Sequence, residues 1–110
     1  MAQHLRGWID YRGSDLGLYY WRTRSGVEVD FVVYGQEGIW GVEVKHTARV
    51  RPEDVRSLKN FSADYPGART ILLHRGRDRL KLGETWCIPV TEFLTALRPD
   101  VSLDEAAGTE

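Results

Sequence analysis

The sequence is poor in cysteine and has no long apolar run, and each shortage excludes a class of protein. A single cysteine among 110 residues, Cys87, excludes a disulfide framework and a cysteine-based metal site. No segment approaches the roughly 18–20 apolar residues of a membrane span, and the first residues lack the apolar core of a signal peptide. We therefore expect a cytoplasmic protein with no membrane contact.

Short motifs of several enzyme classes are also missing. The three histidines, His4, His46 and His74, do not have the spacing of zinc ligands. The sequence contains neither the GxSxG elbow of serine hydrolases nor the GxxxxGK[ST] loop that binds nucleotide phosphates. Zinc enzymes, serine hydrolases of that type and P-loop ATPases are therefore poor matches to this sequence.

Charge is nearly balanced in total but unevenly placed. Fifteen basic and sixteen acidic side chains give a formal net charge of −1. Four of the acids follow Leu97, in the segment RPDVSLDEAAGTE, which has few large apolar residues. We expect one domain over residues 1–97 and an acidic, disordered tail over residues 98–110; the chain up to and including Arg98 has a net charge of about +3. The charge of the domain permits a nucleic-acid partner without requiring one.

Hydrophobic periodicity predicts a mixed α/β fold. Helical spacing of Val55, Leu58, Phe61 and Tyr65 places these four side chains in the core. The expected helices occupy residues 2–11, 52–65 and 91–97. The expected strands occupy residues 18–22, 26–34, 39–46, 69–73, 79–82 and 85–90. This order, α-β-β-β-α-β followed by a β-β-α appendage, is typical of a mixed sheet flanked by helices.

Two alternating strands around the turn GQEG form the strongest pattern. If the turn is centred between its second and third residues, strand residues whose numbers sum to 73 lie opposite each other. Asp30 is then opposite Glu43, and Glu28 is opposite Lys45. The reverse face would carry the apolar residues Val27, Val29, Phe31, Val33, Trp40, Val42 and Val44.

Facing carboxylates repel, so something must offset the charge of Asp30 and Glu43. Exposure to water, a protonated carboxyl, the nearby Lys45 and a bound divalent ion would each do so. A solvated, salt-bridged ladder is one interpretation. A metal site is the other, because hard oxygen ligands suit Mg²⁺ and Gly41 would leave this face open to a substrate.

The spacing Asp30, then Glu43-Val44-Lys45, resembles the D…ExK signature of the PD-(D/E)xK nuclease superfamily. The longer stretch YYWRTRSGVEVDFVVYG…GVEVKHTARVRPEDVRSLKNFSADYP is similar to the C-terminal nuclease-like domain of a large family of prokaryotic AAA-type ATPases. The resemblance covers roughly residues 18–97 and implies a restriction-endonuclease-like core. The ATPase part is absent, which indicates either a fragment or a free-standing relative.

This resemblance implies roles for individual residues. Asp30, Glu43 and the Val44 carbonyl would hold Mg²⁺ (or Mn²⁺), which lowers the pKa of a bound water and stabilises charge on a phosphate. Lys45 would orient that water or stabilise the developing charge, and Glu28 would hold the lysine. Nucleases of the superfamily often add an acid from the first helix, where this sequence has Gln3 and His4.

Basic and aromatic residues outside the hairpin leave two interpretations open. The cations Arg75, Arg77, Arg79 and Lys81 would form either a solvated hairpin or an edge that contacts nucleic-acid phosphates. The aromatic residues Tyr19, Tyr20, Trp21 and Trp86 would pack on the sheet or, where exposed, stack on bases.

Two functions follow as expectations from the sequence. The first is a metal-dependent nuclease-like domain that hydrolyses DNA phosphodiester bonds. The alternative is an inactive nuclease-fold module for nucleic-acid docking, dimerisation or regulation of an AAA-type ATPase in a longer chain. A homodimer would follow if an exposed strand edge pairs with a second copy.

Overall fold

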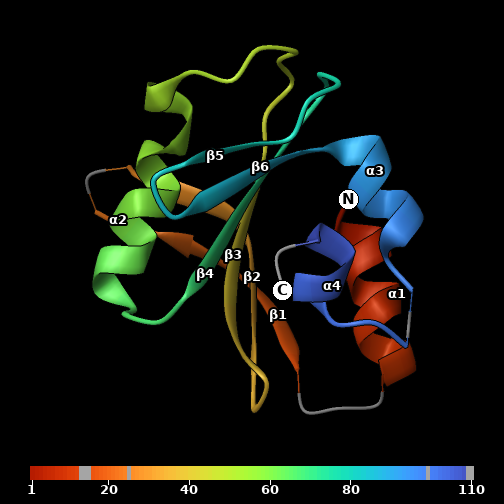
Figure 1. Cartoon of the computed structure of the whole chain (residues 1–110). Coiled ribbons are helices and arrows are strands. Elements are labelled where there is room, and N and C mark those ends of the chain that lie inside the picture. The colour runs from red at the N-terminus through yellow and green to blue at the C-terminus, as the bar shows by residue number, and fades with distance from the viewer. Residues whose placement is uncertain (13–15, 25, 99, 109–110) are drawn as a thin grey trace.

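Six strands form one mixed sheet that lies between two layers of helices (Figure 1). This arrangement comes from a computed structural model, which describes residues 1–12, 16–24, 26–98 and 100–108. The helices are α1 (Ala2–Arg12), the short 3-10 helix η1 (Pro52–Val55), α2 (Arg56–Asp64), α3 (Val90–Ala96) and α4 (Leu103–Ala107). The strands are β1 (Gly17–Arg22), β2 (Glu28–Gly35), β3 (Gly38–Val44), β4 (Arg69–His74), β5 (Leu80–Leu82) and β6 (Thr85–Pro89).

The strands are arranged in the order β1-β2-β3-β4-β6-β5. Strands β1, β2 and β3 are antiparallel, and α2 then crosses one face of the sheet so that β4 runs parallel to β3. The predicted mixed α/β order is confirmed. The idea of a C-terminal appendage is wrong, because β6 pairs directly with β4 and β5 closes the edge of the same sheet.

Both faces of the sheet are covered, and each cover has its own apolar cluster. Helices α1, α3 and α4 cover one face, where Trp40, Val42 and Ile71 belong to the cluster. Helix α2 covers the other, with Leu58 and Phe61 in the cluster. The sequence also predicted Tyr65 as core. That prediction is wrong, because Tyr65 follows the last residue of α2 and is exposed.

The predicted register of the β2–β3 hairpin is confirmed, with Phe31 opposite Val42 and Gly35 opposite Gly38. Strand β2 is nevertheless irregular against β1: Tyr19 pairs with Val32, whereas two residues later Trp21 pairs with Val29, so β2 has one extra residue here. The bulge moves Val29 into the cluster beneath α2, whereas Val33 remains on the other face. Simple alternation therefore assigned Val29 to the wrong face.

Residues beyond Leu97 include an ordered helix, which corrects the prediction of a disordered tail over residues 98–110. Helix α4 begins at a capping box in which the Ser102 hydroxyl accepts a hydrogen bond from the Glu105 N–H. Its Leu103 is fully buried, and the Trp40 indole N–H donates to Asp104 Oδ1 at 2.9 Å. The acidic composition did not indicate this helix, because its buried apolar residues are only Leu103, Ala106 and Ala107.

Among the helices that the structure describes, none has an apolar stretch of the length needed to cross a membrane.

We predict that Leu103→Ala lowers the free energy of unfolding by about 2–4 kcal/mol, because it leaves a cavity beneath α4. Urea unfolding monitored by tryptophan fluorescence measures this change. The control is Asp100→Ala in the same segment, which alters an exposed side chain and should cost less than about 0.5 kcal/mol. Equal, small effects of the two substitutions would show that α4 does not pack as described.

Candidate functional site

Asp30 and Glu43 lie side by side at the point where β2 and β3 separate. The paired residues of the ladder end at Phe31 and Val42. At Asp30, which precedes Phe31 in β2, a side-chain hydrogen bond takes the place of a backbone one. Its Oδ2 accepts a hydrogen bond from the Val44 N–H at 2.9 Å. The bulge and the sequence register together bring the two predicted carboxylates into one site.

Glu43 is buried rather than part of a solvated ladder. Its exposed fraction is 4%, and it lies beside Leu72 of β4. Glu43 Oε2 has no hydrogen-bond partner among the described residues, and Lys45 Nζ lies 3.8 Å from it. A buried carboxylate oxygen of this kind carries a desolvation penalty that one distant, half-exposed ammonium offsets only in part.

Burial raises the pKa of Glu43 to about 7. The Lys45 ammonium acts in the opposite direction, while the negative charges of Asp30, Asp54 and Glu28 raise the pKa further. Two of the expected ways to offset the paired charges therefore operate in the folded chain: the raised pKa of Glu43 favours its protonated form, and Lys45 supplies a nearby positive charge.

Asp54 is a member of this neighbourhood that the sequence did not reveal. It lies on η1, where Asp54 Oδ2 accepts a hydrogen bond from the Arg51 N–H at 2.8 Å. Its charge raises the pKa of Glu43 and adds to the effect of burial on the Cys87 thiol, whose pKa rises to about 11. In the sequence, Asp54 resembles the acidic residues that are common in the first turn of a helix.

Glu28 does not take the predicted place beside Lys45. Its carboxylate forms an exposed ion pair with Arg22 at the end of β1. The physical reason is the bulge in β2, which changes the register to β1 and leaves Glu28 opposite Arg22. Glu28 still lies near enough to Glu43 to affect its charge state.

Gly41 is a packing site and not an opening for a substrate. A Cβ atom at this position would lie 2.9 Å from the Phe61 ring and 3.3 Å from Leu58. Helix α2 therefore rests on β3 through Phe61, and this contact covers the strand on one side of Glu43. Access to the carboxylates must come from the end of β3, where Lys45 is half-buried and Asp30 is exposed.

The described side chains of helix α1 lie away from the carboxylates. Its Leu5 and Trp8 belong to the cluster on the opposite face of the sheet from α2. Gln3 and His4 line a shallow pocket against Leu94 and Leu97 on that same side. Among the described residues, no group of three or more His, Cys, Asp or Glu side chains is arranged to hold a metal ion.

The four predicted phosphate-contacting residues separate into two groups. Arg79 binds Glu92 at 2.6 Å and donates to the Ala107 carbonyl, so it holds α4 in place. Both Arg79 and Lys81 lie over the Trp86 ring, with 5.6 and 5.4 Å to its centroid. Arg79 is half-buried, whereas Lys81 is exposed despite its contact with Trp86, as are Arg75 and Arg77.

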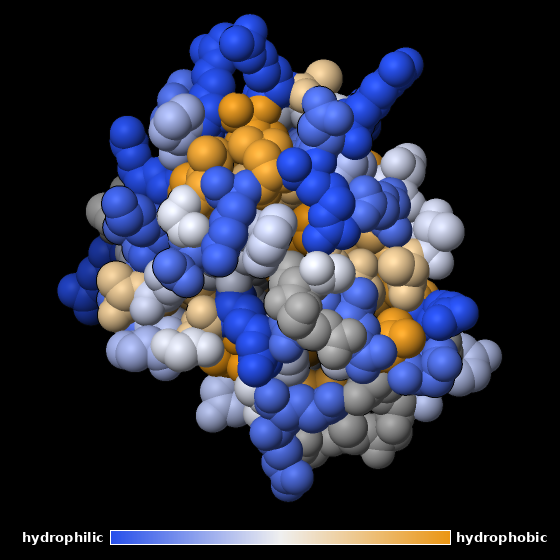
Figure 2. Space-filling model, in the orientation of Figure 1, coloured by the Kyte–Doolittle hydropathy of each residue, from blue (hydrophilic) through white to orange (hydrophobic). Residues whose placement is uncertain are grey.

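Arg75 and Arg77 lie instead beside a second basic segment that sequence reasoning missed. The Arg75 N–H donates to the Thr47 carbonyl at 2.8 Å, which joins the turn after β4 to the loop after β3. That loop carries Arg49 and Arg51, both exposed. Hydrophilic side chains gather at the upper edge of the molecule, where these two loops lie (Figures 1 and 2). We call the two loops that carry Arg49, Arg51, Arg75 and Arg77 the basic loops.

The buried Glu43 makes the free energy of unfolding depend on pH. The unfolded carboxyl ionises near 4.5 and the folded one near 7, so between these values the folded protein binds an extra proton. Stability is therefore lost as the pH rises from about 4.5 to about 7, by about 3 kcal/mol in total at about 1.4 kcal/mol per pKa unit.

We predict that Glu43→Gln lacks this part of the pH dependence, so that its loss of stability between about pH 5 and about pH 8 is smaller than that of the wild type. Urea unfolding at the two pH values measures both. Glu53→Gln, which changes an exposed glutamate on η1, should behave as the wild type does. Parallel pH curves for the wild type and Glu43→Gln would contradict the burial of an ionisable Glu43.

Comparison with known proteins identifies the family. The family described as "Domain of unknown function (DUF4143)" matches residues 1–93. Similar curated proteins are Uncharacterized protein Mb2031c of Mycobacterium bovis and Uncharacterized protein Rv2008c of Mycobacterium tuberculosis, each 33% identical over 79 residues. The matched part is 71% of this chain and 18% of either relative, so the chain spans about a fifth of their length. No solved structure matches. On the family match over most of its length, the chain belongs to the DUF4143 family.

Proposed function

We propose that this chain is a nuclease-like domain of the PD-(D/E)xK type, with a restriction-endonuclease-like core, that hydrolyses DNA phosphodiester bonds with a divalent metal ion. The observation that carries the proposal is the pair formed by Asp30 and Glu43. One oxygen of Glu43 is buried without a hydrogen-bond partner in the described part of the chain, beside a second carboxylate. Buried oxygens of this kind call for a cation.

The donor atoms at the site fit a hard divalent cation. Glu43 offers its unpaired Oε2, and Asp30 offers the oxygen that does not bind the Val44 N–H. The Val44 carbonyl adds a third oxygen, because the N–H and C=O of one strand residue point to the same side, here toward Asp30. Mg²⁺ typically binds through one or two carboxylates and keeps several waters, so a third side chain is not required.

Within this proposal a bound Mg²⁺ or Mn²⁺ would lower the pKa of a water and neutralise charge on the phosphate. Lys45 contributes a half-exposed ammonium at the open end of the site, where it can orient a nucleophilic water or stabilise charge on a phosphate oxygen. Burial of Glu43 keeps bulk water away from one side and strengthens each electrostatic contact. Glu28 has no direct role here, because Arg22 occupies it.

The basic loops supply contacts to the phosphate backbone in this proposal. They follow β3 and β4, so they project from the same end of the sheet as Lys45. Arginine guanidiniums bind phosphate oxygens in a bidentate way and position a duplex without reading its sequence. The proposed docking surface therefore consists of Arg49, Arg51, Arg75 and Arg77. Arg79 and Lys81, which the sequence suggested, are not part of it.

The alternative remains a module without turnover that docks nucleic acid, dimerises or regulates an AAA-type ATPase. Two observations favour it: no three acidic side chains of the described residues are arranged around one metal position, and Phe61 covers the strand beside Glu43. The curated relatives are about five times longer than the matched segment, which leaves room for such a partner domain in a parent chain.

Cleavage of DNA distinguishes the two proposals. We predict that the wild type with Mg²⁺ or Mn²⁺ nicks supercoiled plasmid or cuts branched DNA, and that Asp30→Asn and Glu43→Gln each remove this activity. Lys45→Met should lower the rate about 100-fold or more, the usual effect of losing one group that stabilises the transition state. Glu53→Gln is the matched control and should cleave at the wild-type rate.

If residual cleavage by the wild type equals that of Asp30→Asn, the activity comes from a contaminant and the nuclease proposal fails. Salt-sensitive DNA binding without turnover would then support the alternative module.

Binding of the metal can be tested without DNA. We predict that Mn²⁺ at a hundredfold excess over its Kd stabilises the folded wild type by about 2.7 kcal/mol, because only the folded chain holds the three oxygens together. Thermal unfolding and the electron paramagnetic resonance signal of free Mn²⁺ measure this. Asp30→Asn should abolish the stabilisation, whereas Asp64→Asn on the exposed end of α2 should not. Equal stabilisation of both variants would mean that Mn²⁺ binds elsewhere.

A further inference from the structure

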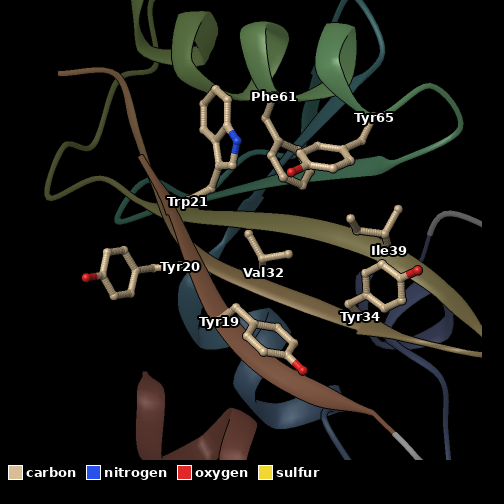
Figure 3. A pocket seen from close by; sticks show the side chains of 8 residues that line it. All are labelled: Tyr19, Tyr20, Trp21, Val32, Tyr34, Ile39, Phe61 and Tyr65. Carbon is tan, nitrogen blue, oxygen red and sulfur yellow. The ribbon is translucent and has the colours of Figure 1, made fainter. Parts of the chain in front are cut away.

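An aromatic cavity of about 380 Å³ lies between α2 and the strands β1, β2 and β3 (Figure 3). Phe61 and Tyr65 reach toward the sheet from the end of α2, and Val32 and Ile39 form the floor. Tyr19, Tyr34 and Trp21 complete the wall, while Tyr20 points outward. Six of the eight lining residues are aromatic, and none carries a charge.

The rings are held in place and yet left open to solvent. Phe61 makes an edge-to-face contact with Trp21 at 5.5 Å between centroids and a tilted contact with Tyr65 at 5.0 Å. Tyr19 and Tyr34 are 60% and 56% exposed. Exposed rings cost free energy in water, and a cluster of them marks a binding surface more often than a part of the core.

We propose that this cavity binds unpaired nucleobases, so that the substrate is single-stranded or locally melted nucleic acid. This inference deepens the proposed nuclease function and rests on it for the nature of the chemistry, but not for the binding itself. Aromatic rings stack on every base because every base has a π-face, and the neutral lining suits bases and not phosphates. Tyrosine hydroxyls at the rim can in addition hydrogen-bond to base edges.

Strand β2 carries both Val32 of the cavity and Asp30 of the carboxylate pair. Val32, on the cavity floor, precedes the hairpin turn, and Asp30 lies two residues earlier, or about 6–7 Å of strand away. Trp21 at the near end of the cavity pairs with Val29, the neighbour of Asp30. A strand whose base enters the cavity therefore brings an adjacent phosphate toward Asp30, the exposed member of the carboxylate pair.

The distribution of charge around the cavity fits a polyanion with neutral bases. Arg22 ends β1, one residue beyond Trp21, and its partner is the exposed Glu28, which a phosphate can displace. The basic loops lie beyond the carboxylates at the end of β3 and β4. Cations thus flank the cavity, whose lining of rings is uncharged, the arrangement of proteins that bind single strands.

Binding in EDTA tests the inference independently of cleavage. Fluorescence anisotropy of a labelled oligothymidylate, and of a hairpin duplex with the same number of phosphates, is measured at fixed salt. We predict that Tyr19→Ala and Tyr34→Ala each weaken oligothymidylate binding roughly 5- to 100-fold, the effect of losing one base stack. Tyr34→Phe keeps the ring and should bind as the wild type does.

The matched control is Tyr11→Ala, which removes a tyrosine that is 79% exposed on α1, the helix on the opposite face of the sheet from α2. It should leave oligothymidylate binding unchanged, and all variants should keep the wild-type circular dichroism spectrum, because each altered side chain is exposed. The duplex should bind through the basic loops and change less than twofold in every tyrosine variant.

Three outcomes overturn the inference. The tyrosine variants could bind oligothymidylate as the wild type does, or weaken single strand and duplex equally. Sedimentation could instead show a wild-type dimer that Tyr34→Ala dissociates, which would assign the cavity to a second copy of the chain. If binding depends on the tyrosines but Mn²⁺ supports no cleavage, the base site is supported and the nuclease proposal fails. If Mn²⁺ supports cleavage but binding does not depend on the tyrosines, the nuclease proposal is supported and the base site fails.

Discussion

The contact between Phe61 of α2 and Gly41 of β3 is the interaction on which the rest of the site depends. A ring can lie flat against the strand only where no Cβ exists, so this glycine sets how closely α2 approaches the sheet. The close approach removes Glu43 from water and thereby raises its pKa. The same ring also forms a wall of the aromatic cavity, through its contacts with Trp21 and Tyr65. One packing contact therefore links the buried carboxylate to the exposed aromatic surface.

Burial of Glu43 opposes folding, and the protein tolerates it because the opposing terms are local. Lys45 offsets part of the charge at 3.8 Å, and the raised pKa allows the carboxyl to hold a proton near neutrality. Asp30 avoids the same penalty, since it stays exposed and binds the Val44 N–H. The two carboxylates therefore have different surroundings: Glu43 is buried beside Leu72, whereas Asp30 is exposed at the end of the hairpin.

Sequence reasoning succeeded where structure follows from neighbours along the chain. Alternation on both sides of a short turn gave the correct β2–β3 register, and helical spacing gave α2 with Leu58 and Phe61 in the core. It failed where a contact joins distant segments. The bulge in β2 depends on pairing with β1, and α4 becomes ordered only because Trp40, Arg69 and Arg79 hold it. Composition cannot report such contacts.

That Asp30 and Glu43 are neighbours follows from the hairpin pattern alone, since a hairpin register is a local property of patterned strands and their turn. The surroundings of the two carboxylates depend on contacts between distant segments. Packing of α2 made Glu43 a buried carboxyl, the bulge gave Glu28 to Arg22, and α4 turned Arg79 into a structural residue. A hydrogen bond between two loops places the segment that carries Arg49 and Arg51 beside the one that carries Arg75 and Arg77. These outcomes arise from desolvation and from contacts between segments far apart in the chain, which no local pattern encodes.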